Sequence, residues 1–341
     1  ETEAETDADT DADTDAETGV DSARLPVPRR CTVILPETVE GVAFVEHLRG
    51  ASAPLGAAPD LLVEVPHGAD RRTHYDALRA RLQGPLPENL HEFFSMNTDV
   101  GAWAFGRATA EAILAADPSR SALLVRCLLP RTFVDTNRVV ELAGGDLTQG
   151  GMTAGIPVYV TDPGDHALLL ELHTAYVEVA RAAYAAVCGK GGLALVPHTY
   201  GPRSVGIQQV DAEIVTNLRE ALAPDKADTW PLRAEVDLLT RDADGTLFAP
   251  EGLEEALQAG FREAGFDVHT NDTYFLHPAT LGHRWSVTYP GQVLSLEVRR
   301  DLLVEAWRWD EEMLPVPEKV ARVAQVLAPA LARRLAPSPR P

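Results

Sequence analysis

The chain has 341 residues, of which 45% are apolar, and a formal net charge of -21 at pH 7. This length allows one large α/β domain or two smaller ones, and the negative charge disfavours nucleic acids and anionic membranes as partners. No apolar run approaches the ~20 residues that a membrane span requires, and three widely spaced cysteines do not indicate a disulfide framework or a zinc knuckle.

Residues 1–24 read as an acidic tail of low complexity. Nine acidic residues alternate with Thr or Ala within the first twenty positions, so the rest of the chain carries about -12 of the -21 charges. Such a segment cannot bury enough apolar surface to fold, and we expect it to be a disordered spacer or an interaction tail. Residues 25–341 are then expected to form a single domain. A cytoplasmic location is the default expectation; an export signal removed upstream is the alternative.

Strands and helices alternate along the first half of the domain. Strands are predicted at residues 31–35, 61–65 and 121–129. Helices are predicted at residues 41–48, 71–82 and 100–116. Thr98 and Asp99 are of the residue types that cap a helix and precede the third of these helices.

The alternation continues to the end of the chain. Residues 144–163 are rich in Gly and Pro and predict a long loop of the kind that borders a site. Helices are predicted at residues 165–187, 211–222, 252–265 and 318–335, and strands at 193–196 and 293–298. Strands that alternate with helices predict an α/β fold: a three-layer sandwich around a mostly parallel, mixed sheet.

The most informative stretch runs from Leu61 to Asp70. A short buried strand ends at Pro66, which cannot donate to a sheet ladder, and a tight turn follows. His67 and Asp70 then emerge at the carboxyl end of the strand, where open α/β sheets place their sites. An imidazole and a carboxylate three residues apart can contribute to one Zn²⁺ site, although a histidine in such a turn can also be an ordinary polar residue.

Three later strands also end in polar residues. Arg131 to Arg138 follow the second buried strand, and His198 follows the third. Glu297 lies within the last strand, whose other residues are mostly apolar, and is followed by Arg299 and Arg300. A lone buried carboxylate is costly, so Glu297 is difficult to explain by packing alone.

Together these residues resemble the N-formylglutamate amidohydrolase family, within the zinc carboxypeptidase and aspartoacylase-like group. The resemblance spans roughly Leu61 to Val304. Its motifs, in order, are Pro66-His67-Gly68, Arg131 with Asp135-Thr136-Asn137-Arg138, His198, and Leu296-Glu297-Val298-Arg299-Arg300. The resemblance implies a fold of the zinc-exopeptidase type and a Zn²⁺-dependent amidohydrolase that cleaves an N-acyl amino acid or a small carboxylate-bearing peptide.

The resemblance also implies roles for individual residues. His67 and His198 match two zinc ligands, and the third ligand is a carboxylate, either Asp70 or Asp99. Asp99 can instead be a helix cap. Glu297 matches the general base that acts on the water activated by the zinc.

A second set of residues matches groups that handle the substrate. Arg131 is expected to polarise the scissile carbonyl. Asn137 and Arg138 are expected to hold a substrate carboxylate, for which a planar guanidinium is suited, and Arg299 is expected to join them.

The chain also departs from the family pattern. The acidic residue that commonly lies two positions before the second histidine is missing, so another group must orient His198. Residues 274–285, with His277 and His283, replace a Gly-rich segment where substrate selectivity is expected. The alternative function is therefore a catalytically silent relative that binds an acylated amino acid or peptide without turnover.

Overall fold

The computed structural model describes residues 33–143, 152–207 and 209–335. The predicted acidic tail, residues 144–151 of the predicted loop at 144–163, and Cys31 lie outside these ranges. Within the described residues, no helix is long and apolar enough to cross a membrane.

The described residues form one seven-stranded sheet, with the order β1-β3-β2-β4-β7-β5-β6. The strands are β1 (Ala43–Arg49), β2 (Leu61–Val65), β3 (Ser121–Cys127), β4 (Leu193–Tyr200), β5 (Val236–Leu239), β6 (Val268–Thr270) and β7 (Val293–Arg299). β1 is antiparallel to β3 and β5 is antiparallel to β7, whereas the other neighbours are parallel. The sheet is therefore mixed and mostly parallel, as the alternation of elements predicts.

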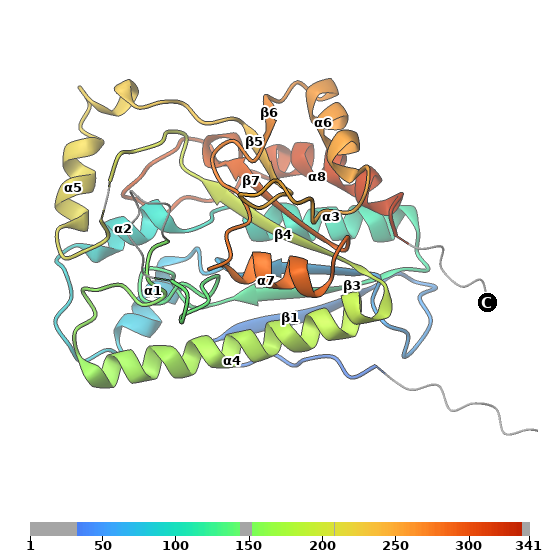
Figure 1. Ribbon diagram of the computed structural model, residues 1–341, viewed down its shortest axis with the longest axis horizontal. Helices are drawn as coiled ribbons and strands as arrows, with labels where there is room; N and C mark the ends of the chain where they lie inside the picture. The colour runs from blue at the N-terminus through green and yellow to red at the C-terminus, as the bar shows by residue number, and fades with distance from the viewer. Residues whose placement is uncertain (1–32, 144–151, 208, 336–341) are drawn as a thin grey trace, which may run out of the picture. The chain divides into compact units, whose positions relative to one another are not determined.

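Helices cover both faces of the sheet, which confirms the expected α/β fold (Figure 1). One face packs against α1 (Arg72–Arg79), α2 (Leu90–Asn97), α4 (Pro163–Val187), α5 (Ile214–Ala221) and α7 (Leu281–Thr288). The other face packs against α3 (Ala102–Ala116), α6 (Leu253–Glu263) and α8 (Pro317–Ala332). Three short 3-10 turns, η2 (Cys188–Lys190), η3 (Ala227–Thr229) and η4 (Arg300–Leu302), connect these elements.

Strand β2 is central, and all five of its residues are buried. Leu61 and Val63 face the layer of α3 and α8, whereas Leu62 faces the layer of α4. A strand with helices on both faces needs apolar residues at consecutive positions, and this is the pattern that predicts it in the sequence.

The turn after β2 requires a glycine. A Cβ added at Gly68 would lie 2.5 Å from Cγ of Arg126 and 2.9 Å from the Cys127 carbonyl oxygen. The Gly68 carbonyl in turn accepts a hydrogen bond of 2.8 Å from Nε of Arg126. The close approach of β3 thus fixes the turn that carries His67.

Several elements differ from the prediction. Residues 41–48, predicted as a helix, belong mainly to the edge strand β1, because pairing with β3 outweighs an apolar spacing that also fits a helix. Val33 to Leu35 are not in a strand. Strand β4 continues past Pro197 to Tyr200, and α2, α7 and β5 were not predicted.

Candidate metal centre

The parallel strands β2, β4 and β7 bring three predicted site residues to one edge of the sheet. β4 pairs in parallel with both β2 and β7, so the carboxyl ends of the three strands lie together. His67 follows β2, and His198 in β4 is directly opposite Glu297 in β7. All three side chains are buried, which separates them from bulk water.

Asp99 joins the two histidines into one cluster. Its Oδ2 atom lies 2.9 Å from Nδ1 of His198 and 3.2 Å from Nδ1 of His67. These three residues are the group in the described part of the chain whose ligand atoms all lie within 4.8 Å of one another. The sequence allows either Asp70 or Asp99 as the third ligand, and of these two the structure brings only Asp99 to the histidines.

The donor set fits a divalent cation such as Zn²⁺. Two imidazole nitrogens and a carboxylate oxygen are common zinc ligands, and ligand atoms about 2.1 Å from one zinc lie roughly 3.4 Å apart. The observed separations of 2.9 and 3.2 Å are near this value. Moreover, the other oxygen of Asp99, Oδ1, is buried without a hydrogen bond.

Asp99 does not cap α3, so the capping interpretation is wrong. The residue that precedes α3 is Gly101, whose φ of +90° is unfavourable for other residue types. Thr98 donates its hydroxyl to the Ala69 carbonyl instead, at 2.8 Å. The carboxylate of Asp99 is therefore free to face the histidines.

Asp135 orients His67 from the opposite side of the ring. Its Oδ1 lies 2.8 Å from Nε2 of His67, leaving Nδ1 directed at Asp99. Asp135 Oδ2 accepts from Arg131 at 2.9 Å and pairs with Arg138 at 3.3 Å. A carboxylate on the outer nitrogen of a ligating histidine fixes its orientation and raises its basicity.

Arg300 lies behind Asp99 and was not predicted as a site residue. Its Nη2 lies 3.6 Å from Asp99 Oδ1 and donates to the Thr199 carbonyl at 2.9 Å. Arg300 also donates to the Met96 carbonyl. It therefore connects β4 and α2 to the carboxylate that both histidines share.

Charges around the cluster shift several pKa values. Burial alone would raise the pKa of Asp99, but the two imidazoles lower it well below its usual range. For Asp135, Arg138 and Arg131 likewise outweigh burial and hold its pKa low. Both carboxylates are therefore ionised at neutral pH and available to a cation and to an imidazole.

Glu297 has a different electrostatic environment. Burial raises its pKa to about 7, even though His198 and Arg300 favour its charged form. Its Oε2 atom is buried without a hydrogen-bond partner. A carboxyl group with a pKa near neutrality and a free oxygen can both accept and release a proton.

Two of the predicted site residues point elsewhere. Asp70 pairs with Arg126 at 2.6 Å and with Arg71 at 3.6 Å, outside the histidine cluster. Arg299 pairs with Asp301 at 2.9 Å and lies 3.5 Å from Glu235. The structure thus places the carboxylate of Asp70 and the guanidinium of Arg299 in structural ion pairs.

The predicted substrate-binding residues Asn137 and Arg138 are both partly engaged within the fold. Asn137 Oδ1 accepts from the Gly282 amide at 3.1 Å, at the start of α7. Arg138 is buried, and besides Asp135 it contacts Thr153 through two hydrogen bonds of 3.3 Å. Arg138 is thus held by groups of the fold, whereas only the side-chain oxygen of Asn137 is engaged in this way.

The segment 274–285, where substrate selectivity is expected from the sequence, follows a turn whose backbone is bound by Asp237 of β5. Asp237 in β5 accepts hydrogen bonds from the amides of Asp272, Thr273 and Tyr274. His283 lies on α7 with its ring against Phe248. Among the described residues, the cluster of His67, Asp99 and His198 includes neither His277 nor His283.

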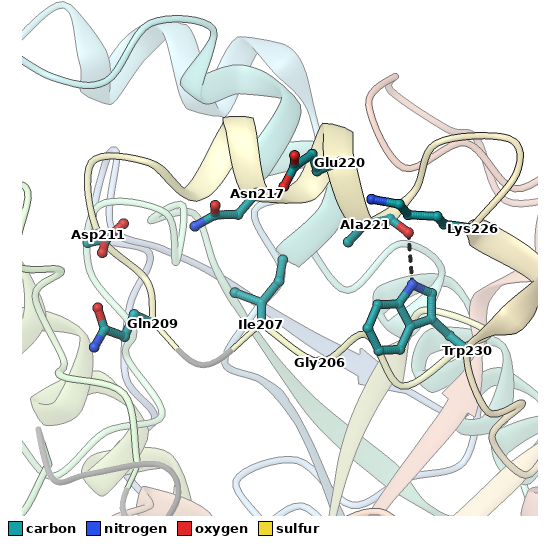
Figure 2. A pocket seen from close by; sticks show the side chains of 9 residues that line it. All are labelled: Gly206, Ile207, Gln209, Asp211, Asn217, Glu220, Ala221, Lys226 and Trp230. Atoms are coloured by element: carbon teal, nitrogen blue, oxygen red, sulfur yellow. Dashed lines mark hydrogen bonds between the residues drawn. The ribbon is translucent and has the colours of Figure 1, made fainter.

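A separate hollow of about 400 Å³ lies beside α5. Figure 2 shows the side chains that line it, among them Asp211, Asn217, Glu220, Lys226 and Trp230. His67, Asp99 and His198 do not line this hollow. It is therefore distinct from the candidate centre.

Comparisons with known proteins were made for the whole chain. No protein-family model and no curated protein matches it. Among solved structures, an N-formylglutamate amidohydrolase from Ralstonia eutropha is 18% identical, with a TM-score of 0.49, over 86% of this chain and 96% of that one. A gene product of Agrobacterium tumefaciens is 19% identical, with a TM-score of 0.48, over 86% and 94%. Similarity at these values assigns neither a family nor an activity to this chain.

Proposed function

We propose that this chain is a metal-dependent hydrolase of amide bonds, with Zn²⁺ as its cofactor. The observation that carries the proposal is the convergence of two imidazoles and a carboxylate beside Glu297, a buried carboxyl group with a free oxygen. The substrate we propose is a small N-acyl amino acid or a carboxylate-bearing peptide.

The proposed ligands are Nδ1 of His67, Nδ1 of His198 and a carboxylate oxygen of Asp99. Three protein ligands leave an open position, which is typical of catalytic rather than structural zinc sites. Zinc bound there supplies Lewis acidity and lowers the pKa of a coordinated water. Asp135 and Arg300 hold the ligands in place from the outside.

Glu297 is the proposed general base. It accepts a proton at Oε2 and transfers it to the leaving nitrogen, which must be protonated before the amide bond can break. Burial raises the pKa of Glu297 above its ordinary value, whereas a bound cation would lower it, so the charged form that accepts a proton is available near neutral pH.

Arg131 is the proposed electrophilic group. Its side chain is partly exposed, and its Nη1 lies 3.8 Å from Asp99 Oδ1, beside the proposed zinc ligands. From this position the guanidinium can stabilise negative charge that develops on the scissile carbonyl oxygen. The pair with Asp135 holds the guanidinium there.

The test is the exchange of Glu297 for Gln, which preserves shape and removes basicity. N-acyl amino acids and short acidic peptides are screened for hydrolysis that is lost on chelation and restored by Zn²⁺. Glu297→Gln is expected to retain zinc and substrate binding while kcat falls by roughly 10²-fold or more.

Glu235→Gln is the matched control, because Glu235 precedes β5 and pairs with Arg299, away from the cluster. It is expected to keep full activity. Unchanged kcat in Glu297→Gln would contradict the assignment of the base. Zinc and ligand binding without any hydrolysis would instead favour the silent-binder alternative.

A further inference from the structure

Arg233 is a cation near the candidate metal centre that pairs with no acidic side chain of the described residues. The other arginines of the site, Arg131, Arg138 and Arg300, each lie within 4.0 Å of Asp99 or Asp135. In the described part of the chain, Arg233 makes no ion pair within this distance; its side chain donates to Ser204, Gly201 and Tyr274. A half-buried positive charge without a counter-charge is a natural receptor for an anion.

Two tyrosine rings hold the guanidinium in place. Its central carbon lies 5.1 Å from the ring centre of Tyr200 and 5.6 Å from that of Tyr274. Tyr200 donates to the Ala234 carbonyl at 2.8 Å, and Asp237 holds the backbone of Tyr274. Stacking of this kind is favourable for Arg and preorganises its planar fork.

The guanidinium retains hydrogen-bonding capacity. An arginine has five N–H donors, and Arg233 uses three of them, two in long bonds of 3.4 Å to Gly201 and Tyr274. Long neutral bonds are weaker than bonds to a carboxylate, so an incoming anion can replace them.

Arg233 also belongs to the electrostatic environment of the centre. Tyr200 is two residues beyond the proposed ligand His198 on β4, and Arg299 donates to the Arg233 carbonyl from the end of β7 at 3.0 Å. The positive charge of Arg233 further lowers the pKa of Glu297. The hydroxyl of Tyr274 also lies close enough to Arg131 and Arg138 to favour the charged forms of both guanidinium groups.

We propose that Arg233, supported by Tyr274, binds the carboxylate of the ligand that enters the centre and so determines its specificity. This role goes beyond the sequence-based assignment, which gave the carboxylate to Asn137 and Arg138, joined by Arg299. Arg138 is buried and paired with Asp135, whereas Arg233 is half-buried and has free donors. The inference rests on the proposed function only in taking the ligand to be the substrate.

The experiment measures how strongly the protein prefers an acid to its neutral amide. The ligands are N-acetyl derivatives of alanine, leucine, phenylalanine and glutamate, each as the free acid and as the α-carboxamide. Affinities are measured by calorimetry on the zinc-loaded full chain carrying Glu297→Gln, which separates binding from turnover. We expect at least one acid to bind roughly 10- to 100-fold more tightly than its amide.

Arg233→Ala is expected to reduce this preference to about onefold, and Arg233→Lys, which keeps the charge, to an intermediate value. Arg203→Ala is the matched control, because Arg203 lies nearby but pairs with Asp228 at 2.9 Å. It should leave the preference unchanged. Melting temperatures of all variants show whether each one is folded, and Arg233→Lys provides the test if Arg233→Ala is not.

An acid preference that survives in both Arg233 variants would overturn the inference. The inference would also be overturned if Arg138→Ala, and neither Arg233 variant, abolished the preference for the acid, or if none of the acids bound. Hydrolysis is measured separately with Glu297 intact. Arg233-dependent binding without hydrolysis would uphold this inference while the proposed function fails.

Discussion

At the residue scale, Asp99 decides whether His67 and His198 form one centre. Its Oδ2 lies within 3.2 Å of both Nδ1 atoms. In the sequence, Asp99 is an aspartate before a helix, and this position suits a helix cap as well as a metal ligand. The spacing of residues does not show that the loop carrying Asp99 folds over the end of β2. The contact of Asp135 with His67 and that of Arg300 with Asp99 likewise depend on how the loops fold, so the sequence does not predict them.

Asp135 should determine the affinity of the centre for metal. Asp135→Asn replaces the anionic partner of His67 Nε2 with a neutral amide, so the imidazole becomes less basic and less well oriented. We expect the dissociation constant for Zn²⁺ to rise roughly 10- to 100-fold in competition with a chromogenic chelator. Asp70→Asn is the control, and an effect of equal size there would contradict the role of Asp135.

The buried Glu64 should make the free energy of unfolding depend on pH. This carboxyl group in β2 is buried and accepts hydrogen bonds from Tyr176 and Tyr184, and burial raises its pKa. Because the pKa of Glu64 is higher in the folded than in the unfolded protein, its protonated form favours folding. This contribution to stability is fully present below the unfolded-state pKa near 4.5 and is lost as the pH rises.

Glu64→Gln removes this titration and keeps an acceptor for Tyr176. The free energy of unfolding of the variant, relative to that of the wild type, should therefore increase from pH 4 to pH 8. Urea unfolding of metal-free protein at several pH values measures it. A difference that is constant with pH would exclude a raised pKa for Glu64.

At the element scale, strands buried on both faces could be predicted and edge elements could not. β2 occupies the predicted residues 61–65 because its consecutive apolar residues meet helices on both faces. β1 is an edge strand whose identity depends on pairing with β3. α2 begins after Asn89, which has a φ of +54° and provides no side-chain cap, so no start signal marks it in the sequence.

The packing of α3 onto the sheet depends on Gly106. A Cβ there would lie 2.7 Å from Cγ1 of Val63 and 3.1 Å from Cγ of Pro197. Gly106→Ala should destabilise the protein by about 1–3 kcal/mol in urea unfolding, although Ala favours a helix by roughly 0.5–1 kcal/mol. At Gly189, whose added Cβ would meet no atom closer than 4.0 Å, Ala should change stability by less than about 0.5 kcal/mol. Equal effects at the two positions would contradict this packing.

At the scale of the whole molecule, strand order explains why residues far apart in the chain meet. β2, β4 and β7 are parallel neighbours, so His67, His198 and Glu297 reach one edge although 230 positions separate the first from the last. The alternation of strands and helices predicts this α/β arrangement. The antiparallel insertion of β5 beside β7, which places Asp237 opposite Glu297, has no counterpart in the sequence pattern.

The central claim is that His67, Asp99 and His198 hold one metal ion. Its most direct test is the zinc content of the purified full chain, by mass spectrometry of the metal after dialysis against a metal-free buffer. We predict about one zinc per chain, and loss of it in His67→Ala, His198→Ala and Asp99→Ala. Asp70→Ala and His269→Ala, which alter an acid and a histidine outside the cluster, should keep it. Full zinc content in all three cluster variants, or loss in Asp70→Ala but not in Asp99→Ala, would contradict the account.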